Sequence, residues 1–354
     1  MSRLAVPTQQ SLWAQALNPP VARLYHSLRY RRLRDLPRSL ILETTSRCNL
    51  TCRMCPRQHM TRSAQDMSPD LFRRLVDQMA DCDQRDLLDF VALHWFGEPL
   101  LHPHLLDLIH YAGQRLPNLR KRGEQRHAVR GLNMSTNAVA LDEPMARGLL
   151  DSPLTWLAVS VDGSNRETYE AMRVGGLFEQ VLENVERLLA FNREQPRHLP
   201  TVTVQVIVTK TTAPELEACV ARWQKHLGGA PNARVELKPY TDWAGQVACP
   251  ELAEPDTRRS FFYLNCGYLY DTLVVGAGGE IGLCCYDVDA RHEIGNAAGT
   301  SLHDLWHGPR LTELRQRMAR GQLADLPLCA NCAMAKKHPA DYLGLSKPRY
   351  GLTE

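Results

Sequence analysis

The sequence predicts an α/β fold, a partial (β/α)6 barrel followed by a smaller C-terminal domain. Two observations predict this fold. Six short apolar, β-branched segments alternate with amphipathic segments between residues 38 and 245, as buried parallel strands alternate with the helices that join them. After residue 245 the alternation stops and closely spaced cysteines follow. We therefore divide the chain into an extension (1–37), the barrel (38–245) and the C-terminal domain (246–354).

The extension is basic, with leucines and a tyrosine among its charges. A nucleic-acid arm is one interpretation. A surface helix that packs on the barrel is favoured, because runs of charge are usually solvated faces. The extension is also too short for a separate peptide-binding domain. Its arginines in this stretch are Arg23, Arg29, Arg31, Arg32 and Arg34.

The strand candidates are residues 40–44, 90–94, 132–136, 156–161, 202–208 and 235–238. Helices fit between them. One begins at Ser68-Pro69, with a serine cap and proline at the first helical position, and another runs on from Phe178. A basic loop, residues 120–127, precedes the third strand and has no assigned function. Folds of this kind place their chemistry at the carboxyl ends of the strands, so we expect functional side chains there.

The composition narrows the functional classes. A net charge of +3 gives no general argument for nucleic-acid binding. No run reaches the roughly 18 apolar residues of a membrane helix, and the first residues lack the apolar core of a signal peptide. We expect a cytoplasmic protein. In that compartment the eleven cysteines indicate metal ligands rather than disulfides.

Three of these cysteines, Cys48, Cys52 and Cys55, follow the first strand in the pattern C-x3-C-x2-C. This spacing suits three corners of a [4Fe-4S] cluster, because soft thiolate ligands select iron–sulfur centres or zinc. Three ligands leave the fourth iron open, and an open iron can bind a small molecule and deliver an electron to it. The alternative is a structural zinc that takes these residues as three of its four ligands.

The stretch resembles the signature of the radical S-adenosylmethionine (SAM) enzymes, and the resemblance covers roughly residues 38–340. In that family the unique iron binds the amino and carboxylate groups of SAM. An electron from the cluster then cleaves the sulfonium and yields a 5'-deoxyadenosyl radical, so the cofactor carries the hard chemistry. The resemblance implies a [4Fe-4S] cluster, SAM and an electron donor such as flavodoxin or ferredoxin.

Supporting motifs follow in the family's order. The segment 96–99 looks like the Gly-Gly-Glu-Pro motif that holds the methionine amino group, with Phe96 in place of the first glycine. Residues 134–137 look like the ribose-binding strand end, and 159–163 match the next strand end. Arg173 matches the basic residue that meets the carboxylate. The implied cofactor-binding residues are Gly97, Glu98, Pro99, Ser135, Asn137, Ser160, Asp162, Arg173 and Met54.

The C-terminal cysteines resemble the auxiliary-cluster domain called SPASM, or its shorter form, twitch. Residues 279–285 are typical of a hairpin that ends in a ligand. The resemblance implies four ligands, Cys266, Cys284, Cys329 and Cys332, for a second [4Fe-4S] cluster with no open iron. A structural zinc with the same ligands is the alternative, and Cys285 could replace Cys284. A fully ligated cluster can relay an electron, tune the site or stiffen the domain.

The remaining cysteines divide into two kinds. Cys82 ends a helix and Cys219 lies in an amphipathic run, so both are interpreted as small core residues. Cys249 lies after the sixth strand, in a loop that would cross the mouth of the barrel. A thiol S–H is weak enough to give a hydrogen atom to a carbon radical. Cys249 is therefore either a catalytic hydrogen-atom donor or an incidental loop thiol.

Acidic residues near the expected mouth would suit a polycationic substrate if they converge. They are Asp162, Asp242, Glu251, Glu254, Asp256, Asp287 and Asp289. Superfamily members with a single auxiliary cluster include enzymes that dehydrogenate or epimerise aminocyclitols and aminoglycosides, and this chain looks similar in length and cysteine count. Peptide-modifying relatives more often carry two auxiliary clusters and a leader-binding domain.

We therefore rank four hypotheses. The first is a radical epimerase of an aminoglycoside in antibiotic biosynthesis, resembling the neomycin-type epimerase, with Cys249 returning hydrogen to the opposite face. The second is an alcohol dehydrogenase of the same superfamily, in which the auxiliary cluster accepts the radical's electron. The third is a peptide maturase. A zinc-bearing interaction protein would explain the cysteines but not Gly97, Glu98 and Arg173 in their places.

Overall fold

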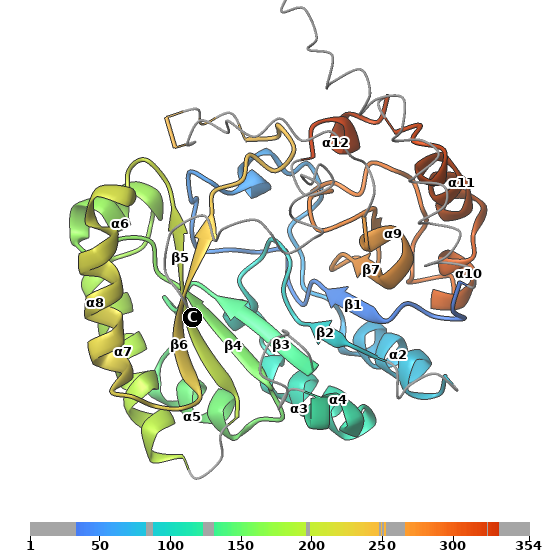
Figure 1. Cartoon of the computed structure of the whole chain (residues 1–354). Helices are drawn as coiled ribbons and strands as arrows, with labels where there is room; N and C mark the ends of the chain where they lie inside the picture. Colours follow the sequence, from blue (N-terminus) through green and yellow to red (C-terminus); the bar gives the residue numbers. More distant parts are fainter. Residues whose placement is uncertain are drawn as a thin grey trace, which may run out of the picture.

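The computed structural model describes residues 33–82, 88–122, 131–195, 199–247, 249, 251–252, 266–323 and 325–332. Within these residues one eight-stranded sheet has the order β6-β5-β4-β3-β2-β1-β7-β8. Figure 1 shows the helices on the outer side of this curved sheet, as expected of a partial barrel. The predictions for residues 1–32, 123–127, Glu254 and Asp256 lie outside the described residues. No described helix is both long enough and apolar enough to cross a membrane.

The six predicted strands are confirmed, with ends shifted by no more than two residues. They are β1 (Ser39–Leu42), β2 (Phe90–Ala92), β3 (Gly131–Thr136), β4 (Trp156–Ser160), β5 (Thr201–Val208) and β6 (Ala233–Pro239). Each pairs in parallel with its neighbour. Their carboxyl ends therefore meet at one edge of the sheet.

The helices of the barrel are α2 (Pro69–Ala80), α3 (Leu105–Arg115), α4 (Pro117–Arg122), α5 (Glu143–Asp151), α6 (Arg166–Met172), α7 (Phe178–Glu194) and α8 (Leu216–Leu227). Three 3-10 helices are η1 (Pro56–His59), η3 (Pro99–Leu101) and η4 (Ala213–Glu215). The predicted cap of α2 is confirmed, because the Ser68 side chain accepts a hydrogen bond from Leu71 N. The basic insertion begins inside α4. Cys219 is buried on α8, as predicted for a core residue.

The C-terminal region joins the same sheet. Strand β7 (Thr272–Val275) pairs in parallel with β1 and antiparallel with β8 (Ile281–Gly282), which confirms the predicted hairpin. Helices α9 (Tyr268–Asp271), α10 (Leu302–Trp306), α11 (Pro309–Ala319) and α12 (Pro327–Ala330) surround it. One apolar core runs from the barrel into this region, including Leu40, Leu273 and Trp306. The sheet and core therefore continue past residue 246.

Candidate active site

The first cysteine loop follows β1 at the carboxyl edge of the sheet. Its backbone is tied to the end of α6, since Thr51 N donates to Val174 O (2.9 Å) and Arg53 N donates to Met172 O (3.0 Å). Apolar side chains on both segments, including Met54 and Met172, pack together beneath the thiols. This packing fixes three free cysteines on one short turn.

The charges around these thiols suit metal-bound thiolates. Burial raises the pKa of Cys48, Cys52 and Cys55, that of Cys55 to about 12, while Arg173 opposes the rise at all three. Asn137 Nδ2 donates to Cys48 Sγ at 3.8 Å, and Arg173 Nη1 donates to Cys52 Sγ at 4.0 Å. Neighbouring cysteines raise the pKa of Cys52 and Cys55, which places the three thiols within electrostatic reach of one another. The donor set therefore fits an iron–sulfur cluster.

The segment with the Gly-Glu-Pro sequence is locked against this loop. A Cβ on Gly97 would lie 1.8 Å from Thr45 O, so only glycine fits there. The Glu98 carboxylate accepts hydrogen bonds from Thr136 Oγ1 (2.6 Å) and Asn137 N (2.7 Å) and also caps η3. In this arrangement Glu98 orients the end of β3 and so presents Asn137 to Cys48.

The other cofactor-binding candidates lie at the same edge. Arg173 forms a buried ion pair with Asp162, with Nη2 and Oδ2 2.6 Å apart, and Asp162 also accepts a hydrogen bond from Ile207 N. Burial lowers the pKa of Arg173, but Asp162 and Cys52 outweigh it and the net shift is upward. Ser135 and Ser160 lie side by side, with their Oγ atoms 3.5 Å apart. The structure thus brings the predicted residues together, while their roles toward SAM stay predictions.

Cys249 lies against the first cysteine loop. Its Sγ donates to Arg53 O at 3.5 Å, and its side chain packs on the apolar group that contains Cys52 and Met54. An ion pair between Arg53 and Glu251, 2.5 Å long, ties the following residues to the same loop. The interpretation of Cys249 as a thiol near the reacting centre therefore has geometric support.

The C-terminal cysteines also gather in one place. Burial raises the pKa of Cys266, Cys284, Cys285 and Cys329, and other cysteines of the group raise each further. The Tyr268 hydroxyl opposes the rise in the pKa of Cys285, whereas Cys284 Sγ accepts a hydrogen bond from Tyr286 N. Among described residues, no three His, Cys, Asp or Glu side chains are close enough to hold one metal ion. A four-iron cluster is larger, with a separate iron for each thiolate.

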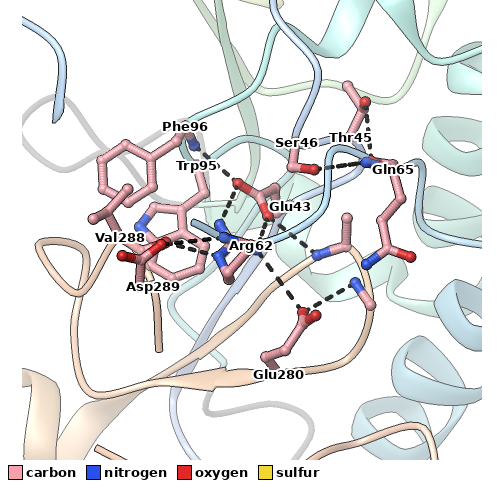
Figure 2. Close-up of polar contacts among 12 residues, drawn as sticks. Glu43, Thr45, Ser46, Arg62, Gln65, Trp95, Phe96, Glu280, Val288 and Asp289 are labelled. Carbon is pink, nitrogen blue, oxygen red and sulfur yellow. Dashed lines mark hydrogen bonds and ion pairs between the residues drawn. The ribbon is translucent and has the colours of Figure 1, made fainter. Parts of the chain in front are cut away.

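A buried ion pair joins the two cysteine regions, and Figure 2 shows it. Arg62, seven residues after Cys55, binds Glu43 of the segment after β1 through both terminal nitrogens, at 2.8 and 3.1 Å. Arg62 Nε also donates to Val288 O (2.7 Å), and Glu43 accepts from Ala277 N (3.1 Å). Sequence reasoning missed this joint. The available signal was an acidic residue, Glu43, directly after an apolar strand.

The described acidic residues among those expected at the mouth do not converge on it. Asp162 is taken by Arg173, and Asp287 accepts hydrogen bonds from Leu283 N and Arg291 N. Asp289 accepts from Thr61 N and binds Arg291. Asp242 and Glu251 are exposed, and Glu251 pairs with Arg53. The convergence on which the polycation argument depended is therefore not seen among the described acidic residues, and the substrate class stays a prediction. These carboxylates hold loops together instead.

Comparisons with known proteins agree with this arrangement. Residues 42–218, half of the chain, match the Radical SAM superfamily. This chain belongs to that superfamily. Residues 266–333 match SPASM, an iron–sulfur cluster-binding domain. The cofactors of the barrel are therefore SAM and a [4Fe-4S] cluster. The SPASM domain binds additional iron–sulfur.

Three curated relatives are similar to parts or most of the chain. The tungsten-containing aldehyde ferredoxin oxidoreductase cofactor-modifying protein of Pyrococcus furiosus is 30% identical over 57% of this chain, which spans about half (52%) of that relative. The mycofactocin maturase MftC of Mycolicibacterium smegmatis is 25% identical, covering 88% of this chain and 79% of the relative. The SAM-dependent 2-deoxy-scyllo-inosamine dehydrogenase of Niallia circulans is 20% identical, with coverages of 82% and 90%.

Solved structures share the fold. BtrN in complex with AdoMet and 2-DOIA has a TM-score of 0.53 at 18% identity, covering 84% of this chain and 93% of that one. Streptococcus suis SuiB bound to precursor peptide SuiA has a TM-score of 0.57 at 16% identity, with coverages of 84% and 71%. At these identities the likeness concerns the fold alone.

Proposed function

We propose that this radical SAM enzyme removes a hydrogen atom from a ring carbon of an aminocyclitol or aminoglycoside and epimerises that carbon. The observation that carries the proposal is Cys249, whose thiol lies against the loop of Cys48, Cys52 and Cys55 and packs beside Met54. The substrate class is supported by the similarity to the 2-deoxy-scyllo-inosamine dehydrogenase.

Bound SAM and the cluster supply the radical that abstracts hydrogen. The residues of this chain then have separate tasks. Arg173 and Asn137 direct positive charge and a hydrogen-bond donor toward the thiolates. Cys249 breaks its S–H bond, gives the hydrogen atom to the opposite face of the substrate radical, and is left as a thiyl radical. A one-electron reductant of the flavodoxin or ferredoxin class and one proton restore the thiol.

A dehydrogenase of a secondary alcohol is the second candidate, favoured by the same curated relative. There the substrate radical would lose a proton and pass its electron to the auxiliary iron–sulfur site. The similarity to MftC favours a third outcome, a peptide substrate. The task of hydrogen-atom donor for Cys249 belongs to the epimerase.

An incubation in D2O separates these functions. Reconstituted protein is given SAM, dithionite and candidate aminoglycosides under anaerobic conditions, and products are read by mass. An epimerase that uses Cys249 places one deuterium at the inverted carbon, because a thiol exchanges its proton with solvent. Cys249→Ala should then still form 5'-deoxyadenosine but no inverted product, whereas Cys82→Ala should behave as wild type.

Other results would replace this proposal. A product two mass units lighter, without deuterium at that carbon, would establish the dehydrogenase. Normal turnover by Cys249→Ala would remove the donor role. Reaction only with a peptide would establish the third candidate.

A further inference from the structure

A short turn after β6, residues 241–247, lies between the first cysteine loop and the C-terminal cysteines. Trp243 Nε1 donates to Met54 O (2.7 Å), beside Cys55. The same indole packs edge-on against Tyr286, with ring centroids 5.1 Å apart, two residues after Cys284. A Cβ on Gly245 would lie 3.8 Å from Asn331 Nδ2, between Cys329 and Cys332. In Figure 1 this gold segment runs from β6 past the blue cysteine loop toward α12.

The backbone of the turn is strained. Trp243, Ala244 and Gly245 have φ values of +55°, +61° and +82°, so two residues with side chains adopt the left-handed region in succession. Such a conformation persists only where the surroundings over-determine it. Here Trp243 N donates to Thr241 Oγ1, and Gln246 Nε2 donates to both Trp243 O (2.7 Å) and Tyr286 O (2.6 Å). These hydrogen bonds hold the turn in its left-handed conformation and so fix the orientation of the Trp243 indole.

The indole of Trp243 packs against the ring of Phe96. Its ring centroid lies 5.6 Å from that of Trp243 and 4.9 Å from that of Trp95, and Trp95 Nε1 donates to Cys285 O (2.9 Å). Phe96 is the residue that departs from the Gly-Gly-Glu-Pro pattern, and a glycine there would leave one side of the indole without a partner. A continuous row of aromatic rings therefore lies between the barrel site and the C-terminal site. It consists of Trp95, Phe96, Trp243 and Tyr286.

We propose that Trp243 is a positioning residue that fixes the separation of the two iron–sulfur sites. It acts through Met54 on one side and Tyr286 on the other, with Phe96 behind it. The inference holds for an epimerase and for a dehydrogenase alike.

The test measures the distance between the two reduced clusters by pulsed electron paramagnetic resonance of the holoenzyme, without substrate. Trp243→Ala removes the ring and the N–H group, whereas Trp243→Phe keeps a ring and loses the bond to Met54. Trp156→Phe is the matched control, because its indole also donates one hydrogen bond (2.8 Å, to Thr203 Oγ1) within the sheet between β4 and β5.

Wild type and Trp156→Phe should give the same narrow distance distribution. Trp243→Ala should broaden it or shift its mean by about 1–2 Å, the size of shifts between packed elements. An unchanged distribution in a Trp243→Ala protein that keeps both clusters would overturn the proposal. If Trp243→Ala fails to hold both clusters, Trp243→Phe decides by the same criterion, a change supporting the proposal and no change overturning it.

Discussion

The two cysteine regions differ in the charges that surround their thiols. At the barrel loop Arg173 opposes the rise in pKa of all three cysteines, and Arg57 helps at Cys48. Of Cys266, Cys284, Cys285 and Cys329, only Cys329 has a nearby cation, Arg317, that lowers its thiol pKa. The barrel site therefore has protein charge to stabilise thiolates and an anionic ligand. The C-terminal site depends on its metal for that stabilisation.

This difference has consequences for folding. Cysteine thiols must lose their protons to bind metal. Where the protein supplies little positive charge to stabilise the resulting thiolates, the metal ions supply that charge. We therefore expect the segment that carries Cys329 and Cys332 to loosen when its cluster is lost, whereas β7 should stay paired with β1 in the sheet. The barrel, with its parallel sheet and continuous apolar core, should keep its fold when the first cluster is absent.

The largest expected effect follows from removing C-terminal ligands. Cys329→Ala with Cys332→Ala should lower the iron content from about eight to about four per chain, since each filled site holds four irons. It should also make the region around α11 sensitive to protease. Cys82→Ala is the control for loss of a thiol. Stoichiometric zinc with only about four irons in anaerobically purified wild type would contradict a second cluster.

The joint between the regions gives the next effect. Glu43→Gln should lower the free energy of unfolding by about 3 kcal/mol, because Arg62 loses its short buried ion pair and keeps the longer one to Glu280 (3.8 Å). Adding Arg62→Met should recover part of that loss. Arg115→Met breaks solvent-exposed ion pairs with Asp77 and Asp81 and should cost much less, because water screens such pairs. Anaerobic urea titration measures the free energy of unfolding of wild type and the three variants. Equal losses in Glu43→Gln and Arg115→Met would contradict a stabilising role for the buried Arg62–Glu43 ion pair.

Acid should weaken the barrel mouth through His94. Burial lowers the pKa of this histidine from 6.5 to about 4, and Ser135 N donates to its Nδ1. The unfolded chain therefore binds a proton below pH 6.5 that the folded chain refuses until about pH 4, so stability is lost as pH falls through this window, by up to about 3 kcal/mol. His94→Gln should reduce this loss. Parallel acid dependence of the unfolding midpoint in both proteins would refute it.

The smallest effect concerns the hydrogen bond to Cys48. Asn137→Ala removes the amide donor at Cys48 Sγ. A hydrogen bond to a cluster sulfur favours the reduced, more negative state, so its loss should lower the reduction potential of the barrel cluster. A bond of about 1 kcal/mol corresponds to on the order of 40 mV for one electron. Redox titration without SAM checks the sign of this shift in the reduction potential. Asn192→Ala in α7 is the control.

Much of the fold could be predicted because its signals are local. The six parallel strands are short apolar runs, and α2 begins at a serine and a proline that can hardly start anything else. The first cysteine loop could be singled out by its C-x3-C-x2-C spacing, and the C-terminal cysteines by their resemblance to SPASM, which the match over residues 266–333 confirms. Strand β7 was not assigned, since four apolar residues in a cysteine-rich region do not reveal that they pair with β1.

The parts that escaped prediction depend on contacts across long stretches of sequence. Arg62 reaches Glu43, Val288 and Trp95 at once, and nothing near position 62 indicates this. Trp243 gains its role from a left-handed backbone that no residue preference predicts. The acidic residues misled for the same reason, because whether a carboxylate faces substrate or caps a loop is decided by its distant partners.

Formation of 5'-deoxyadenosine by two sets of variants tests the central contrast between the regions most directly. Reconstituted protein is incubated anaerobically with SAM and dithionite. Cys48→Ala, Cys52→Ala and Cys55→Ala, alone or together, should abolish SAM cleavage, because the open iron is lost. Cys329→Ala with Cys332→Ala should still cleave SAM, because the barrel site is intact. A triple variant of the barrel cysteines that still forms 5'-deoxyadenosine would contradict the assignment of the site.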